Sequence, residues 1–183
     1  MRVISGIARG TKIKSIDSMS TRPTLDRVKE ALFNILQNYI KNAIVLDLFA
    51  GSGALGIEAL SRGAKRAYFC DINKEAIKII KENLEKTRLI EKSVIYNEDY
   101  IIAIKKIKEP LSIVFLDPPY KLDLAVKSIK ELQKNKLLTN NSIIIIETDE
   151  LNRDIEELQK IENLEIIDNR KYGRANLIFI KTN

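Results

Sequence analysis

Short apolar runs rich in β-branched residues alternate with stretches of helical periodicity from residue 44 to the end of the chain. The clearest helical stretch is 74–87, in which Ala76, Ile77, Ile80 and Leu84 share one face opposite a row of charged residues. Alternation of this kind is typical of βαβ units and a mostly parallel sheet. The expected strands are 44–49, 66–71, 93–97, 112–116, 142–147, 164–168 and 175–181, and the expected helices between them are 53–62, 74–87, 99–107, 122–135 and 152–160.

The last two expected strands are separated only by the short segment 170–174. A connection of this length has no room for a crossover helix, so the two strands must be antiparallel. The pattern therefore predicts an α/β fold with a seven-stranded, doubly wound, Rossmann-like sheet whose last strand is antiparallel.

The first 41 residues depart from this alternation. We expect a small hairpin over 2–16, turning near Arg9-Gly10, and a helix that opens at Pro23-Thr24. The chain is then one domain over 1–183, with a basic hairpin-helix extension (1–41) and a catalytic core (42–183). The apolar stripe of the first helix is formed by Leu25, Val28, Leu32, Ile35 and Leu36.

Composition narrows the class of protein. The 183 residues are 45% hydrophobic and 31% charged, which is typical of a globular chain. No apolar stretch approaches the ~18 residues of a membrane span, and no secretory signal is visible. Cys70 is the one cysteine and histidine is absent, which excludes an intramolecular disulfide, histidine triads and most zinc sites. We therefore expect a cytoplasmic protein with no membrane partner and no metal.

Positive charge is concentrated near the N-terminus. The net charge is +6, and residues 1–41 contain eight basic against three acidic side chains. A basic extension on an otherwise balanced domain indicates a polyanionic partner, usually nucleic acid, although a merely solvated basic face is the alternative. The phosphate-binding candidates on the hairpin are Arg2, Arg9, Lys12 and Lys14.

The segment 47–56 reads Asp-Leu-Phe-Ala-Gly-Ser-Gly-Ala-Leu-Gly and joins the first expected sheet strand to the next helix. Its glycine spacing matches the dinucleotide fingerprint, so an NAD enzyme is one alternative. Asp47 argues against it, because a carboxylate ~4 Å from a phosphate would cost roughly 4 kcal/mol at an effective dielectric of 20. A cationic ligand would turn this repulsion into attraction.

S-adenosyl-L-methionine is such a ligand, with an ammonium, a sulfonium and no phosphate. Asp47 can meet its amino-acid end, Asp71 its ribose hydroxyls and Asp99 its adenine amino group, each contact contributing about 1.5 to 3 kcal/mol. Alternatively, Asp99 only caps the following helix and Asp71 is an ordinary turn residue. The expected cofactor-binding residues are Asp47, Phe49, Ala50, Gly51, Ser52, Gly53, Asp71, Ile72, Asp99 and Tyr100.

The tetrapeptide Asp117-Pro118-Pro119-Tyr120 follows the apolar run 113–116. The two prolines end a strand and stiffen the backbone, since proline has a fixed φ and no amide hydrogen. A carboxylate, a free carbonyl and an aromatic ring then stand at a strand end, which favours gripping a flat ring that carries an amine. The plain alternative is a tight turn after a core strand.

Four segments together resemble one known family: residues 47–64, the tetrapeptide at 117–120, Arg22 to Leu36 (R-P-T-L-D-R-V-K-E-A-L-F-N-I-L), and Lys171-Tyr172-Gly173. In combination they look like the RsmD-type methyltransferases, which modify the exocyclic 2-amino group of a guanine in bacterial small-subunit (16S) ribosomal RNA. The resemblance covers essentially the whole chain. It implies a class I S-adenosylmethionine-dependent methyltransferase fold, the cofactor at the residues named above, and the target amine at Asp117 to Tyr120.

On this hypothesis Asp117 and the Pro118 carbonyl accept the two amino protons and Tyr120 stacks on the flipped base. The partner is ribosomal RNA within a small-subunit assembly particle, and the protein is expected to be a monomer. Arg22 and Arg27 can face either the RNA or the carboxylate of the cofactor. Tyr172 and Arg174 either line the target pocket or belong to a surface turn.

Three other functions remain open at this stage. A DNA adenine amino-methyltransferase can use the same tetrapeptide, although no long insertion for reading a duplex is seen. A protein-glutamine methyltransferase is less favoured, because that motif usually begins with asparagine. A noncatalytic RNA-binding module with a methyltransferase fold would keep the architecture without binding the cofactor.

Overall fold

The structure, a computed structural model, describes residues 1–16, 22–118, 122–173 and 175–183, without the side chains of residues 22–25, 122 and 175. The strands are β1 (Ile44–Asp47), β2 (Arg66–Cys70), β3 (Ser93–Tyr96), β4 (Leu111–Leu116), β5 (Leu138–Thr148), β6 (Leu164–Tyr172) and β7 (Ala175–Thr182). The helices are α1 (Arg22–Ile35), α2 (Ala54–Ser61), α3 (Lys74–Thr87), the 3-10 turn η1 (Ile90–Lys92), α4 (Tyr100–Lys106), α5 (Leu122–Lys134) and α6 (Leu151–Leu158).

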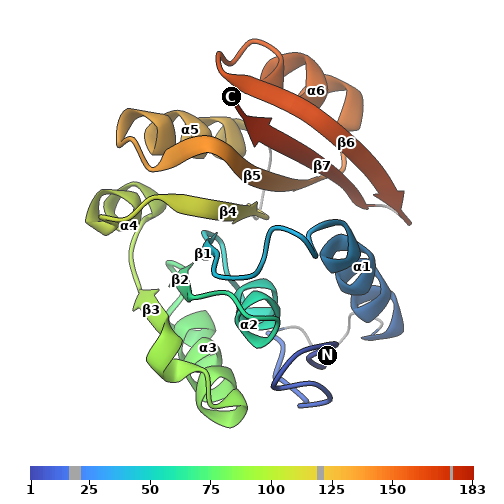
Figure 1. Cartoon of the computed structure of the whole chain (residues 1–183), viewed down its shortest axis with the longest axis vertical. Coiled ribbons are helices and arrows are strands. Elements are labelled where there is room, and N and C mark those ends of the chain that lie inside the picture. Colours follow the sequence, from blue (N-terminus) through green and yellow to red (C-terminus); the bar gives the residue numbers. More distant parts are fainter. Residues whose placement is uncertain (17–21, 119–121, 174) are drawn as a thin grey trace.

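One seven-stranded sheet forms the centre, in the order β3-β2-β1-β4-β5-β7-β6 (Figure 1). β1 to β5 are parallel, and β7 is antiparallel to both of its neighbours. β2 and β3 follow β1 on one side of the sheet, and β4 then lies on the other side of β1, so the strand order reverses at β1. The predicted doubly wound α/β fold with an antiparallel last strand is therefore confirmed.

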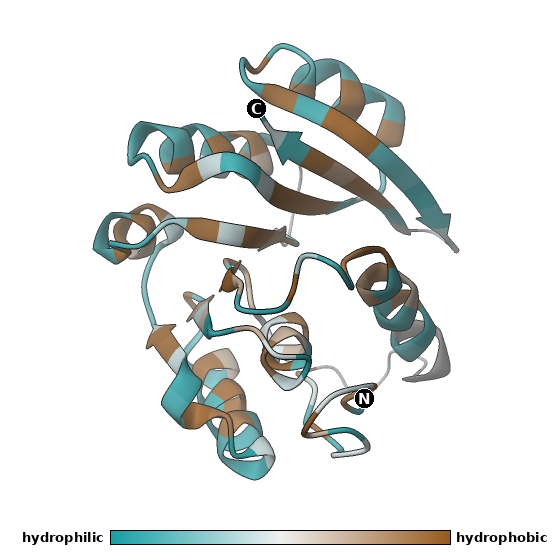
Figure 2. Cartoon of the chain, viewed as in Figure 1, coloured by the Kyte–Doolittle hydropathy of each residue, from teal (hydrophilic) through white to brown (hydrophobic). Residues whose placement is uncertain are grey.

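Helices cover both faces of the sheet, and each face has its own core. On one face α1, α2 and α3 pack over side chains such as Val45, Phe69 and Phe115. On the other face α4, α5 and α6 pack over alternate residues such as Leu46, Val114 and Ile144. Because successive strand residues point to opposite faces, nearly continuous apolar strands supply both cores. Figure 2 shows the matching amphipathic helices, apolar toward the sheet and polar outside.

Close packing fixes the first crossover helix on the sheet. A Cβ placed on Gly56 of α2 would lie 2.3 Å from Cε1 of Phe69 in β2, a distance that no real contact shows. Glycine at this position therefore lets α2 approach β2, which is the close helix–strand packing expected of the third glycine in such a loop.

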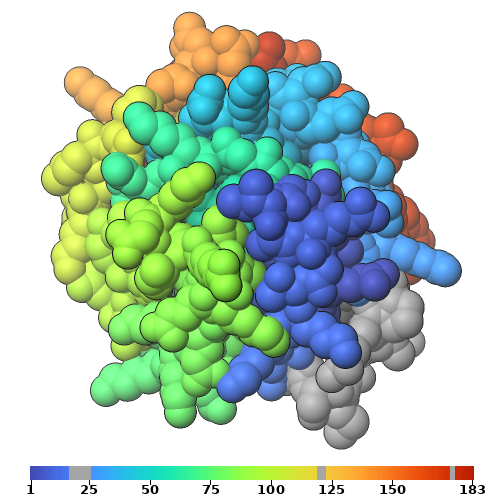
Figure 3. Space-filling model, turned by 60° about the horizontal axis from the view of Figure 1, so that its bottom comes forward, coloured from blue at the N-terminus to red at the C-terminus, as the bar shows by residue number. Residues whose placement is uncertain are grey.

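The N-terminal segment is tied to α2 and α3. The hairpin expected over 2–16 is present as a single antiparallel bridge between Arg2 and Lys12 rather than as two strands. Ala8 donates its backbone N–H to Ser61 Oγ (3.0 Å), and Lys14 donates its own to Asn83 Oδ1 (2.8 Å). Figure 3 shows these first residues, in dark blue, lying on the surface against the green segment that contains α3.

Element boundaries differ from the prediction mainly in β5 and β6. β5 begins at Leu138, four residues before the expected start at 142, and ends at Thr148. β6 continues through Arg170, Lys171 and Tyr172, which the sequence pattern assigned to the connection. The strand extends because residues 168–172 pair in register with 175–179 of β7, leaving only residues 173 and 174 between the two strands. None of the helices among the described residues is long and apolar enough to cross a membrane.

Candidate active site

The carboxyl edge of the parallel strands gathers the acidic side chains that the sequence singled out. Asp47 ends β1, Asp71 follows β2, Asp99 follows β3 and Asp117 follows β4. In an open α/β sheet ligands bind outside this edge, at the point where the strand order reverses. Here that point lies between β1 and β4, beside Asp47 and Asp117.

The glycine loop after β1 is held open by Asp71 and Asn83. Gly51 and Gly53 have φ values of 53° and 75°, which glycine adopts without strain. Gly51 donates its N–H to Asp71 Oδ2 (2.9 Å), and Asn83 donates from its side chain to the Ser52 carbonyl (2.9 Å). The loop backbone is therefore fixed before any ligand arrives.

Asp47 is buried beneath this loop, with a relative exposure of 4%. Its Oδ2 accepts the N–H of Gly56 (3.0 Å). Burial raises the pKa of Asp47 from 3.8 to about 7, and the negative charges of Asp117 and Asp71 add to the effect. A cation bound nearby would favour the ionised form of this carboxyl group.

A larger cavity of about 600 Å³ lies over the ends of β1, β2 and β3. Asp71 and Asp99 stand on its wall, and Phe49 contacts Tyr100 there with ring centroids 5.9 Å apart. Ile72 is 73% exposed at the same cavity. Among the described residues that line it are four carboxylates and no lysine or arginine, so the cavity suits a ligand that is cationic or rich in hydrogen-bond donors.

Asp99 and Asp71 each perform a local structural role as well. Asp99 is the N-cap of α4 and accepts the N–H of Ile101 (2.9 Å). Asp71 accepts from Asn73 (2.8 Å) in addition to Gly51. Both local alternatives considered for these acids therefore occur, and they hold the carboxylates in place at the cavity wall.

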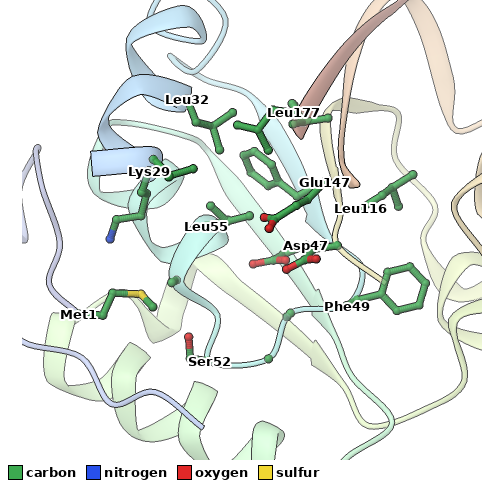
Figure 4. A pocket seen from close by; sticks show the side chains of 17 residues that line it. Met1, Lys29, Leu32, Asp47, Phe49, Ser52, Leu55, Leu116, Glu147 and Leu177 are labelled. Carbon is green, nitrogen blue, oxygen red and sulfur yellow. The ribbon is translucent and has the colours of Figure 1, made fainter. Parts of the chain in front are cut away.

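A smaller cavity of about 210 Å³ lies between α1, the glycine loop and the ends of β4 and β5. Its walls are mostly apolar, with Leu32, Leu55 and Leu177 around it (Figure 4). Asp47 and Glu147 point their carboxylates into the same part of this cavity (Figure 4). The three residues that line both cavities are Phe49, Gly51 and Asp117.

Asp117 and Glu147 interact electrostatically. Both keep access to solvent, yet partial desolvation by the cavity walls raises the pKa of both carboxyl groups. The pKa of Glu147 rises to about 7, first through this desolvation and then through the charge of Asp117. Hydrogens donated by a ligand would stabilise the ionised form of the pair.

The predicted nucleic-acid residues are only partly brought together. Arg2, Arg9 and Arg27 line one groove of about 520 Å³ beside α1. Lys12 is exposed, and Lys14 pairs with Glu82 of α3. Arg2 Nε lies 3.8 Å from Asp26 Oδ2. The negative charge of Asp26 reduces the attraction of Arg2 for a phosphate.

Several expected site residues lie outside the described part of the chain. These are Pro119, Tyr120 and Arg174, together with the side chain of Arg22. Pro118 is half-buried next to Asp117. Tyr172 is also half-buried; it ends β6 next to the short connection to β7, and its side chain packs against the core under α1 and α2.

Three polar residues at the site were not among the sequence candidates. Asn97 donates to the carbonyls of Asp71 and Ile72 (3.0 Å each) and fixes the loop after β2. Glu98 lines the larger cavity, and its Oε2 is buried without a hydrogen-bond partner among the described residues. Glu147 follows the apolar run 143–146, the same signal that drew attention to Asp117, and could have been found by it.

Known structures share this architecture over the whole chain. The Escherichia coli protein yhhF superimposes with a TM-score of 0.85 at 30% identity, covering 100% of this chain and 98% of that one. A tRNA methyltransferase from M. jannaschii, at 21% identity and a TM-score of 0.67 over 88% of this chain, shares the fold. The fold and its acidic carboxyl edge define a class I methyltransferase.

Sequence comparison then gives the family. The model described as Conserved hypothetical protein 95 matches residues 1–181, and the chain belongs to that family, the RsmD-type family that it resembled. The Ribosomal RNA small subunit methyltransferase D of Haemophilus influenzae is 40% identical over 81% of this chain and 79% of its own length. The protein of the same name from Escherichia coli (strain K12) is 38% identical over 81% of this chain and 75% of its own.

The raised pKa of Asp47 predicts a pH-dependent effect of Asp47→Asn on the stability of the unliganded protein. The folded-state pKa, about 7, exceeds the unfolded value of 3.8, so the wild type loses stability as pH rises between these values. Each pKa unit corresponds to about 1.4 kcal/mol. Asp47→Asn should therefore be more stable than wild type at pH 8, by up to about 4 kcal/mol, and similar to it at pH 4.

Urea denaturation at several pH values measures this difference. Asp149→Asn, which removes an exposed carboxylate outside both cavities, is the matched control and should follow the wild type. A gain in Asp47→Asn that stays constant from pH 4 to pH 8 would contradict the prediction.

Proposed function

We propose that this protein transfers a methyl group from S-adenosyl-L-methionine to the exocyclic 2-amino group of a guanine in small-subunit ribosomal RNA. The observation that carries the proposal is the meeting of two cavities at Asp117: a large acidic one beside the glycine loop and a small apolar one that also contains Glu147. The names of the relatives support the class of substrate.

The larger cavity fits the proposed cofactor. Its carboxylates would repel the phosphates of a dinucleotide and attract an ammonium or sulfonium. Asp71 would accept from the ribose hydroxyls while it continues to hold Gly51. Asp47 lines the adjoining smaller cavity and would hold the amino-acid end where the two cavities meet at Gly51. Exposed Ile72 supplies an apolar surface for the adenine, and the unpartnered Oε2 of Glu98 offers an acceptor in addition to Asp99.

When bound, the cofactor supplies a methyl group on a positively charged sulfur. The Asp117 carboxylate and the Pro118 carbonyl accept the two amino hydrogens and turn the lone pair of the guanine nitrogen toward that methyl group. The nitrogen would form the new N–C bond, and the electron pair of the broken S–C bond would remain on sulfur. Alignment of this kind lowers the barrier by several kcal/mol.

One proton must leave the methylated nitrogen. Desolvation makes the Asp117 carboxyl group a stronger base than an ordinary aspartate, because it raises the pKa. The proton passes to this carboxylate and then to solvent. Histidine is therefore not required.

The N-terminal extension would contact the RNA backbone. The groove that contains Arg2, Arg9 and Arg27 is next to α1, whose Lys29 and Leu32 line the smaller cavity. A phosphate chain in this groove would lead toward that cavity. Tyr120, Tyr172 and Arg174 remain candidates for holding the base, and a small-subunit assembly particle in the cytoplasm remains the proposed setting, with the protein acting as a monomer.

Mass spectrometry of cellular nucleic acid tests the function directly. Small-subunit RNA from cells that lack the gene should be missing one N2-methylguanosine, and the gene should restore it. Loss of a methyladenine from DNA with unchanged ribosomal RNA would assign the protein to the DNA adenine amino-methyltransferases instead.

Replacement of Asp117 separates catalysis from cofactor binding. Asp117→Ala should abolish turnover, because the amine loses its acceptor, while calorimetry should find cofactor affinity within about threefold of wild type. An equal loss of cofactor affinity would move Asp117 into the cofactor site. Asp149→Asn again serves as the control for removing a carboxylate from this edge.

The groove beside α1 predicts a salt-dependent contribution to RNA binding. Arg9→Gln should weaken binding and reduce the slope of log affinity against log salt by about 0.7, the value for one phosphate contact on a single strand. Lys134→Gln, at the end of α5 on the opposite face, should leave the slope unchanged. Equal slopes for wild type and Arg9→Gln would exclude this groove.

A further inference from the structure

Asp117 and Glu147 stand side by side at the ends of neighbouring strands. Leu116 of β4 pairs with Ile146 of β5, so the next residue on each strand is the acid. Phe115 and Ile145, two residues earlier, both point into the core under α1 and α2. Because side chains alternate along a strand, Asp117 and Glu147 point to that same face, into the smaller cavity.

Among the residues that the structure describes, Glu147 has no partner that would explain it. No hydrogen bond or ion pair joins its carboxylate to another of these residues, and it interacts with the charge of Asp117. It also ends a run of four buried isoleucines, where a carboxylate contributes nothing to packing. The carboxylate of Glu147 lies beside Asp117, the proposed acceptor of the target amine. Its position is best explained by an interaction with the ligand that binds in the cavity.

The walls of the cavity suit a flat ring. Leu55 and Leu177 lie on one side of the carboxylates in this view, and Leu116 and Phe49 lie on the other (Figure 4). Apolar side chains can cover the faces of a base, so its edge is left for the two carboxylates. The order of donors and acceptors along that edge then decides which base is accepted.

We propose that Glu147 is a specificity-determining residue, which accepts the N1–H of the target guanine while Asp117 accepts from the adjacent 2-amino group. This inference rests on the proposed function and deepens it. N1–H and the 2-amino group are neighbouring donors on guanine, and two neighbouring carboxylates are matched acceptors. Adenine presents a lone pair at N1, which faces an ionised Glu147 unfavourably.

The electrostatics of the pair agree with this assignment. Desolvation and the charge of Asp117 raise the pKa of Glu147, in keeping with an ionised form that has few stabilising partners among the described residues. Two guanine donors would supply them. A base that offers an acceptor instead leaves a carboxylate unsatisfied, which is how sites built to hydrogen-bond one group reject an analogue that lacks it.

The test uses 2-aminopurine, which keeps the 2-amino group of guanine but has an unprotonated N1. The methylated guanine is first mapped in the RNA substrate of the wild type, which tests the proposed function by itself. The same substrate, assembled from ligated RNA fragments, then carries guanine or 2-aminopurine at that position. The measured quantity is the ratio of kcat/KM for guanine to kcat/KM for 2-aminopurine.

Glu147→Gln should lower this ratio at least about tenfold, since the amide can donate to N1 of 2-aminopurine as well as accept from guanine. Glu147→Asp keeps the charge and should retain more of the ratio than Glu147→Gln. Asp149→Asn should leave the ratio unchanged, and cofactor affinity should be unaffected in all three variants.

A ratio within about twofold of wild type in Glu147→Gln, or an equal loss of rate on both bases, would overturn the inference while leaving the proposed function intact. An equal shift in Asp149→Asn would also overturn it, because general charge at this edge would then explain the effect. Absence of N2-methylguanine with the wild type would instead refute the proposed function.

Discussion

The arrangement of the site depends on one buried carboxylate, Glu58 of α2, which is fully excluded from solvent. It accepts the backbone N–H groups of Ile4 (2.8 Å) and Ser5 (3.0 Å), the Nε of Arg62 (2.8 Å), and pairs with Lys29 Nζ at 3.3 Å. A buried charge is tolerated only when it is satisfied in this way.

Glu58 thereby joins the N-terminal segment, α1 and α2, and Met1, Lys29 and Leu55 from these elements line the smaller cavity. Desolvation lowers the pKa of Lys29, and the charge of Glu58 opposes that effect. The basic extension is therefore part of the wall of the site and not only an appendage.

Much of the fold was predictable because the strands are buried on both faces and their connections have strong signals. The apolar run 113–116 predicts β4 almost to the residue, and Asn73, whose side chain caps α3 at Glu75, marks the start of that helix. The acids at successive strand ends were predictable for the same reason, since they follow apolar runs directly. The position of Glu147 beside Asp117 was less predictable than the residue itself, because nothing in the linear order places β5 beside β4 until the sheet is assembled. The length of β6 was also missed, since residues 170–172 are polar and form a strand only through pairing with β7. Glu58 was hard to predict for the same reason. It looks like an ordinary helical acid until Ile4 and Ser5, more than 50 residues away, are brought to it by the fold.

Asp117 gives the two cavities a common boundary. Asp47 pairs in register with Phe115, and Asp117 lies two residues beyond Phe115. Asp117 is therefore close to the glycine loop on one side and to β5 on the other. Desolvation raises the pKa of Asp47, Asp117 and Glu147 alike, and the first two charges also repel one another. Such a row of carboxylates costs stability in the unliganded protein and is relieved by ligands that carry positive charge or donate hydrogens. The three carboxylates therefore lower the stability of the unliganded fold and favour ligand binding.

The smaller cavity draws on both ends of the chain, with Met1 on one wall and Leu177 of β7 on another. β7 enters the sheet between β5 and β6, and its Leu177 pairs with Glu147 in register. During synthesis the wall made by Leu177 therefore forms only after residue 177 has left the ribosome and the last hairpin has closed. Among the described residues, the lining of the larger cavity extends only as far as Leu124. On the proposed function, a chain shortened before Leu177 would keep the lining of the proposed cofactor cavity and lose one wall of the proposed base cavity.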